Sequence, residues 1–232
     1  MYSFNRIEQH IMSEAQTTMR MLISKQHLQQ SVQKCADVIN AKFAGKDVVI
    51  VGILKGAVYF YVDLTRKLTI LHSCYFIEAT SYHDSQSQSG LSIFSSITPQ
   101  KFAGKHVILI DELYDNGHTL DTIKTAIHEK ANVPLDMIFT CTLFKKKKET
   151  KYALPDLFGI SIPDIWVVGY GLDDKQQYRH FENLYAIQKN EGVEKTDDDK
   201  MFDDDALWNN MMFSIIAQCN SCLLYTSPSP RD

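Results

Sequence analysis

The 232-residue sequence lacks several features that define other classes of protein. It has no apolar run near the ~18–20 residues that a membrane-spanning helix needs, and its first 20 residues lack the apolar core of a secretory signal. Lysine and arginine number 24 against 28 acidic residues, which gives a net charge of −4 and disfavours a basic nucleic-acid binder. We therefore expect neither a nucleic-acid partner nor a membrane partner.

Cysteine is scarce, and histidine shows no metal-binding pattern. Of the five cysteines, Cys35, Cys74 and Cys141 each stand alone in apolar segments, where cysteine usually behaves as a small buried hydrophobe. The eight histidines have no zinc-ligand spacing. This usage predicts a reduced, cytoplasmic protein without a zinc site.

The acidic residues are concentrated after the last periodic segment. Residues 191–205 contain eight acids and two lysines, so this segment has a net charge of −6. Because the whole chain has a net charge of −4, the remaining residues have a net charge of about +2. We expect residues 191–221 to form an acidic, disordered tail. Residues 222–232 match, in one reading frame, the translation of a transposase adapter used in sequencing libraries, and we interpret them as an artefact that also creates the CxxC at Cys219 and Cys222.

Hydrophobic patterning over the remaining chain predicts a single α/β domain over residues 21–190, after an N-terminal extension or frayed helix at 1–20. A helix is expected after Ser24, a plausible N-cap, and another at 58–68. Apolar runs indicate buried parallel strands at 47–53 and 106–110, and further strands are expected at 72–79 and 137–144, with shorter ones at 165–168 and 184–187. The alternation of strands and helices predicts a parallel sheet flanked by helices, and the polar residues 81–92 predict a long loop.

The segment 107–120 carries the most informative motif. Asp111 and Glu112 follow an apolar strand, Asp115 comes three residues later, and a glycine turn then leads into a helix. Backbone N–H groups at such a turn can bind a phosphate, and the paired acids suit vicinal hydroxyls or Mg²⁺. An acidic surface turn is the alternative, and a Walker phosphate loop is excluded because its sequence is absent.

This segment resembles the 5-phosphoribosyl-1-pyrophosphate (PRPP) motif of type I phosphoribosyltransferases, and more narrowly the hypoxanthine-guanine group, over about residues 20–190. The resemblance implies a parallel sheet flanked by helices with a small hood formed by the N- and C-terminal segments. It also implies that Asp111 and Glu112 hold the ribose hydroxyls and Mg²⁺. The turn that would bind the 5-phosphate comprises Asp115, Asn116, Gly117, His118 and Thr119.

Two departures from the family pattern lie in this motif. Most members have Glu-Asp where this chain has Asp111-Glu112, and a threonine and a lysine where it has Asn116 and His118. The reversed pair and the histidine are similar to divergent guanine phosphoribosyltransferases of diplomonad-type protists.

The resemblance assigns a pyrophosphate site and a closing loop to other segments. Leu54, Lys55 and Gly56 resemble the pyrophosphate loop, in which the Leu-Lys bond is cis, and Arg179 would reach pyrophosphate. Ser81 and Tyr82 resemble the start of the loop that closes over the reacting centre and excludes water. A routine strand-to-helix turn and a solvated surface loop are the respective alternatives.

The resemblance places the purine near the strand that ends at Lys145. This lysine would donate to the 6-oxo group, Trp166 would stack on the ring beside Val167, and Asp173 would help to bind Mg²⁺ near the purine 2-position. The alternatives are a solvated basic face for the run 145–148 and a core position for Trp166.

The implied reaction is the Mg²⁺-dependent transfer of 5-phosphoribose from PRPP to N9 of guanine or hypoxanthine, with Asp115 as the general base toward the N7 proton. The resemblance also implies a homo-oligomer, either a dimer or a tetramer. A non-catalytic PRPP-binding regulator of the same fold is the alternative. This alternative predicts that the residues of the purine half of the site are missing. The sequence contains all four of them in the expected order: Lys145, Trp166, Asp173 and Arg179.

Overall fold

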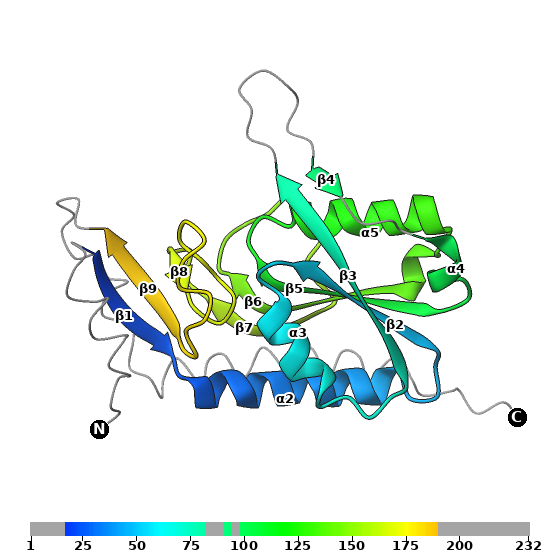
Figure 1. Ribbon diagram of the computed structural model, residues 1–232, viewed down its shortest axis with the longest axis horizontal. Helices are drawn as coiled ribbons and strands as arrows, with labels where there is room; N and C mark the ends of the chain where they lie inside the picture. The colour runs from blue at the N-terminus through cyan, green and yellow to red at the C-terminus, as the bar shows by residue number, and fades with distance from the viewer. Residues whose placement is uncertain (1–16, 82–90, 94–97, 190–232) are drawn as a thin grey trace, which may run out of the picture.

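The computed structural model describes residues 17–81, 91–93 and 98–189 (Figure 1). The expected closing loop from Tyr82 onward, the acidic tail at 191–221 and the residues 222–232 lie outside the described part, apart from the short strand at 91–93. No helix in the described ranges is long and apolar enough to cross a membrane.

A six-stranded sheet forms the centre of the fold. Its order is β4-β3-β2-β5-β6-β7. The five neighbouring strands β3, β2, β5, β6 and β7 are parallel, while β4 runs antiparallel to β3. This arrangement confirms the predicted parallel sheet. The strands are β2 (Val48–Leu54), β3 (His72–Ser81), β4 (Leu91–Ile93), β5 (His106–Tyr114), β6 (Ile138–Lys146) and β7 (Leu157–Ile162).

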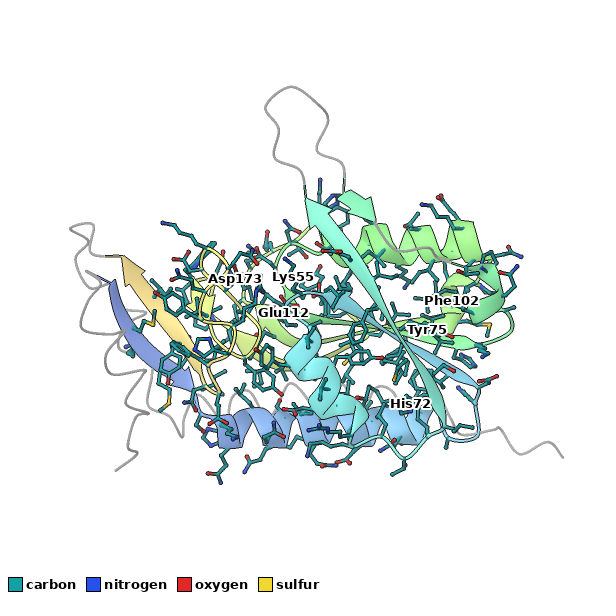
Figure 2. All side chains as sticks on the ribbon, in the orientation of Figure 1. Lys55, His72, Tyr75, Phe102, Glu112 and Asp173 are labelled. Atoms are coloured by element: carbon teal, nitrogen blue, oxygen red, sulfur yellow. The ribbon has the colours of Figure 1, made fainter. Side chains whose placement is uncertain are left out.

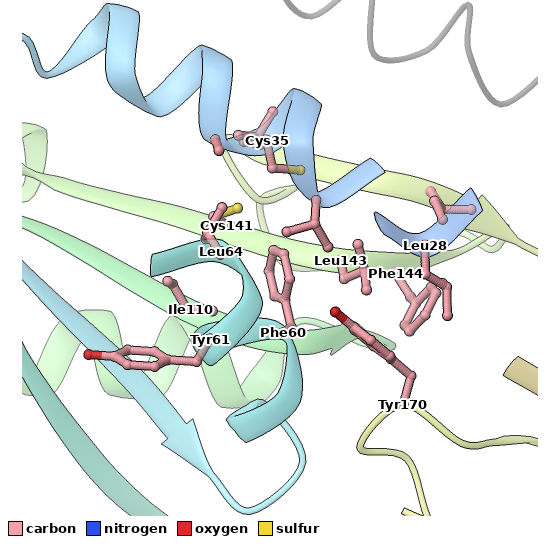
Figure 3. Close-up of a cluster of buried hydrophobic side chains, with 14 of the residues drawn as sticks. Leu28, Cys35, Phe60, Tyr61, Leu64, Ile110, Cys141, Leu143, Phe144 and Tyr170 are labelled. Atoms are coloured by element: carbon pink, nitrogen blue, oxygen red, sulfur yellow. The ribbon is translucent and has the colours of Figure 1, made fainter. Parts of the chain in front are cut away.

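Helices cover both faces of this sheet. Helices α2 (Lys25–Lys42) and α3 (Val58–Thr65) lie on one face and α5 (His118–Ala131) on the other (Figure 1). Alternate residues of β2 enter the two cores, because successive side chains of a strand point to opposite faces: Val48 and Ile50 pack with α2 and α3, whereas Val49 and Val51 pack with α5. The first core is shown in Figure 3. Two short helices also lie in the described part of the chain: α4 (Pro99–Phe102) and the 3₁₀ helix η1 (Leu135–Met137).

Helix α2 follows the sequence pattern closely. The Ser24 hydroxyl accepts a hydrogen bond from the backbone N–H of His27 at 3.4 Å, as expected of an N-cap. Leu28, Val32, Cys35, Ala36 and Ile39 form its buried face, so the predicted helical stripe is confirmed.

A second, three-stranded sheet forms the hood. It consists of β1 (Thr17–Ile23), β9 (Leu184–Lys189) and β8 (Val167–Val168), all antiparallel, with β9 in the middle. Met19, Val168, Phe181, Tyr185 and Ile187 form its own small core. The hood therefore combines the two ends of the domain, as the resemblance implied.

Several boundaries differ from the sequence-based ones. The boundary drawn at residue 20 falls inside β1, which is a strand rather than a frayed helix, since its pairing with β9 is a long-range contact that no local pattern reveals. The segment 81–92, expected to be loop throughout, is paired at both ends because β4 pairs with the end of β3. Strand β7 was not predicted, α3 ends at Thr65 rather than at residue 68, and β5 continues to Tyr114.

Candidate active site

The predicted phosphate turn lines a cavity of about 40 Å³ between the end of β5 and the start of α5. The Asn116 side chain closes the turn before the helix, because its oxygen accepts from the backbone N–H of His118 at 2.9 Å, while Gly117 is the N-cap residue of α5. Gly117 has φ of +87°, and a Cβ there would lie 2.6 Å from the Tyr114 hydroxyl, so only glycine fits. Five of the predicted residues line the cavity: Asp111, Asp115, Asn116, Gly117 and Thr119.

His118 lies outside the lining of this cavity. Its Nδ1 is 3.1 Å from the Tyr152 hydroxyl, and the two rings are 5.6 Å apart. The buried Tyr114 hydroxyl lies 2.9 Å from the Thr150 hydroxyl and donates to the Tyr152 carbonyl at 3.0 Å. Residues 150–152 thus support the turn from outside, a role that the sequence did not indicate.

The two acids of the motif lie within β5 rather than after it. Asp111 is buried, with 8% exposure, and its Oδ1 accepts from the backbone N–H of Glu112 at 3.0 Å. Burial raises the pKa of Asp111. The pKa of Glu112 lies well above its usual range because of burial and, next, the negative charge of Asp111. A cation bound by oxygen atoms would relieve both effects, so the pair fits a role in Mg²⁺ binding.

The two carboxyl groups contact each other and also reach different neighbours on either side of β5. Asp111 lines the phosphate-turn cavity on the α5 side, whereas Glu112 rests against Gly56, where a Cβ would overlap its carboxylate. Gly56 follows the Leu54–Lys55 bond, which is cis as the resemblance implied. Lys55 is exposed, and Figure 2 shows it together with Glu112 and Asp173 near the carboxyl ends of β2 and β5.

The loop after β8 contacts the pyrophosphate loop through two glycines. Gly171 has φ of +101°, and a Cβ there would overlap the Gly56 carbonyl oxygen. Arg179 donates to the Gly171 carbonyl at 2.7 Å and pairs with Asp173 at 2.6 Å. It also lines a cavity of about 420 Å³ with Tyr59, Gln176, Gln177, Tyr178 and His180.

Asp173 is held by groups of its own loop. Besides Arg179, the backbone N–H of Gln176 donates to its second oxygen at 2.7 Å. Within the described ranges, no three His, Cys, Asp or Glu side chains lie close enough to hold a metal ion together. Asp111, Glu112 and Asp173 therefore do not form a ready-made three-carboxylate cage.

The predicted purine residues lie on β6 and at β8. Lys145 donates to the Lys146 carbonyl at 3.3 Å, and its Nζ lies 5.8 Å from the centre of the Phe158 ring. Trp166 is 52% exposed, which excludes the alternative of a core tryptophan, and its backbone carbonyl accepts from the N–H of Ile187 in β9. Val167, next to it, is buried in β8.

The basic run of residues 145–148 is not a uniformly solvated face. Lys147 is exposed, but Lys146 and Lys148 form ion pairs with Asp115 in the phosphate turn and with Asp164, two residues before Trp166. No pattern in the sequence indicates these ion pairs. Of the two expected closing-loop residues, Ser81 ends β3 and Tyr82 lies outside the described part.

The fold is that of a phosphoribosyltransferase, as comparisons with known proteins show. Residues 21–175 match the phosphoribosyl transferase domain, and the chain belongs to this family. It is 29% identical over 173 residues to a hypoxanthine phosphoribosyltransferase of Escherichia coli K12, covering 73% of this chain and 96% of the relative. A hypoxanthine-guanine phosphoribosyltransferase of Streptococcus pneumoniae is 28% identical over 171 residues, with 73% and 93% coverage.

A solved structure confirms the narrower resemblance to the hypoxanthine-guanine group. The hypoxanthine-guanine phosphoribosyltransferase of Bacillus anthracis is 31% identical and superposes with a TM-score of 0.61, over 73% of this chain and 96% of that one.

Proposed function

We propose that the protein is a purine-salvage enzyme that transfers 5-phosphoribose from PRPP to N9 of hypoxanthine or guanine, releasing pyrophosphate. The observation that carries this proposal is the cavity at the β5–α5 junction, where four residues of the phosphate turn, Asp115, Asn116, Gly117 and Thr119, meet beside a desolvated carboxylate pair. The family match and the named relatives support the same reaction.

PRPP would bind across the carboxyl ends of β2 and β5. The 5-phosphate would occupy the turn formed by Asp115, Asn116, Gly117, His118 and Thr119, where the N-terminus of α5 favours an anion. Because Asn116 already accepts from the His118 N–H, the phosphate would have to share or displace that bond. Asp111 and Glu112 would bind the ribose hydroxyls. The pyrophosphate would lie along Leu54, Lys55 and Gly56, within reach of Arg179.

Magnesium would be held by one or two of the carboxylates Asp111, Glu112 and Asp173, with the substrate's own oxygens completing its shell, as is usual for this ion. It would neutralise charge on the pyrophosphate leaving group. The raised pKa values of Asp111 and Glu112 support this role, because ionised carboxylates in a desolvated pair need a cation.

The purine would lie between β6 and the hood. Lys145 would donate to its 6-oxo group and the exposed ring of Trp166 would stack on it beside Val167. Asp115 would accept the N7 proton as N9 bonds to the ribose, which requires a carboxylate within hydrogen-bond reach of that proton. The loop that begins at Ser81 and Tyr82 would exclude water from the reacting ribose.

Incubation with PRPP, Mg²⁺ and hypoxanthine, guanine or xanthine, followed by measurement of pyrophosphate and nucleotide, tests this proposal and identifies the preferred base. We expect turnover with at least one 6-oxopurine. PRPP binding without turnover of any purine would contradict the proposal and indicate the non-catalytic regulator instead.

We further propose a homo-oligomer, either a dimer or a tetramer. Three large apolar side chains on or beside α3 and β3 support an interface there: Leu71 is 91% exposed, Phe76 40% and Tyr59 39%. Analytical ultracentrifugation would test this, since a monomer at micromolar concentration would contradict it. Cytoplasmic location stays a prediction.

A further inference from the structure

Four charged side chains join three segments of the site into one cluster. The Lys146 ammonium lies 3.0 Å from Asp164 Oδ1 and 3.6 Å from Asp115 Oδ1. The Lys148 ammonium contacts the same Asp115 oxygen and lies 3.5 Å from Asp164 Oδ1. Two cations from the end of β6 thus bridge a carboxylate of the phosphate turn and a carboxylate of the loop that leads to Trp166.

The cluster is partly shielded from water, so its pairs are more than transient surface contacts. The side chain of Lys146 is only 11% exposed and that of Lys148 29%, whereas both carboxylates are 45% exposed. An ammonium at such low exposure needs a partner to offset its lost hydration. The pKa of Lys148 is raised, chiefly by its hydrogen bond to Asp115, and the pKa of Asp164 is lowered, chiefly by Lys146.

Both lysines contact the same oxygen of Asp115. With Oδ1 in ion pairs with two ammonium groups, the side chain loses rotational freedom, and Oδ2 would be the oxygen left to accept a substrate proton. Fixing a reacting group in one orientation is worth a large part of a catalytic barrier. The shared partner Asp164 also fixes the position of the Trp166 loop relative to that oxygen.

We propose that Lys146 and Lys148 are positioning residues that orient Asp115 for proton abstraction and couple the phosphate turn to the purine-stacking loop. The inference rests on the proposed function. Before the reaction, the two lysines balance two carboxylates. When Asp115 accepts the purine N7 proton on Oδ2, it becomes neutral, and Asp164 remains as the carboxylate that both lysines contact, so the four groups change from a net charge of zero to one of +1.

Lys148→Gln is the sharper test, because Lys148 is more exposed than Lys146 and its loss costs the fold less. We expect kcat to fall by about tenfold while the KM values for purine and PRPP change less than about threefold. Lys148→Arg should restore most of the loss. The matched control is Lys147→Gln, which removes the exposed neighbour of the same run and should leave kcat and the melting temperature unchanged.

The decisive measurement repeats Lys148→Gln in an Asp115→Asn background. If Lys148 acts through Asp115, the two losses will not add, and the double variant will have the kcat of Asp115→Asn alone. An equal tenfold loss in both backgrounds would overturn the proposal, as would an unchanged kcat in the single variant. A PRPP KM raised more than about tenfold would overturn it as well, by indicating direct contact between Lys148 and the substrate phosphates.

Failure of this proposal is distinct from failure of the proposed function. A wild-type protein that releases no pyrophosphate with any 6-oxopurine would refute the function and this inference together. An active wild type whose Lys148→Gln variant is additive with Asp115→Asn would refute the positioning role alone.

Discussion

The contact between Gly171 and Gly56 predicts that Gly171→Ala damages both stability and PRPP binding. Gly171 has φ of +101°, where an L side chain is strained, and its added Cβ would overlap the Gly56 carbonyl oxygen and lie 3.0 Å from the carbonyl carbon. The strain alone costs about 1–3 kcal/mol. The overlapping atoms belong to backbone and cannot rotate away, so we expect a total loss of roughly 2–4 kcal/mol in the free energy of unfolding.

The same steric overlap should also weaken PRPP binding. Gly56 belongs to the proposed pyrophosphate loop, and the Glu112 carboxylate lies against it. A displacement of Gly56 would therefore shift both the loop and this carboxylate. We expect the PRPP KM of Gly171→Ala to rise at least about tenfold, which corresponds to about 1.4 kcal/mol of binding. Urea unfolding and initial rates at varied PRPP would measure the two effects.

Gly45→Ala is a matched control for the backbone strain. Gly45 also has positive φ, +70°, but nothing lies within 4 Å of its Cβ position, and it precedes the opposite end of β2 from the site. It should lose about 1–2 kcal/mol of stability from strain and keep its PRPP KM. If Gly171→Ala changed the unfolding free energy and the PRPP KM no more than Gly45→Ala does, the close approach of Gly171 to Gly56 would be refuted.

Three further changes separate the proposed roles of single side chains. Asp115→Asn should lower kcat by at least ~10²-fold with less than about tenfold change in PRPP affinity, and a near-normal kcat would exclude it as the base. Trp166→Ala should raise the purine KM far more than the PRPP KM, and equal effects on both in a folded variant would contradict stacking. Glu112→Gln should abolish activity yet raise the melting temperature of the ligand-free protein. Because folding raises the pKa of Glu112, the wild-type protein loses stability as the pH rises above the ordinary glutamate pKa of ~4.3. The gain in melting temperature of Glu112→Gln should therefore grow with pH and vanish in acid. A gain that does not depend on pH would refute the raised pKa of Glu112 as its cause.

Local patterns were enough to predict the parallel sheet and its helices. Continuous β-branched runs identify β2 and β5 because buried parallel strands are apolar on both faces, and the stripe from Leu28 to Ile39 identifies α2. The site residues came from a motif and a family resemblance. The cis Leu54–Lys55 bond, for example, has no signal in composition or periodicity, yet the structure contains it.

The elements that the sequence missed depend on long-range partners. Strand β1 is short and gains its structure from pairing with β9, more than 160 residues later by the register Thr17–Lys189. The lysine–aspartate cluster is hidden for the same reason. A run of four lysines looks solvated, but Lys146 lies in β6 and the N–H of Lys147 donates to Ile162 of β7, which directs alternate side chains inward.

The reversed acidic pair acquires a physical meaning from the strand that carries it. Because successive side chains of β5 point to opposite faces, the shorter Asp111 faces the phosphate-turn cavity, and the longer Glu112 faces the pyrophosphate loop. In the proposed PRPP complex, the order of the two acids would therefore decide which one reaches further toward which half of the substrate. Gly56 matches this order, since only a residue without Cβ leaves space for a glutamate carboxylate at that point. Gly56 and Glu112 together, rather than the acidic pair alone, would therefore define the geometry of the proposed pyrophosphate site.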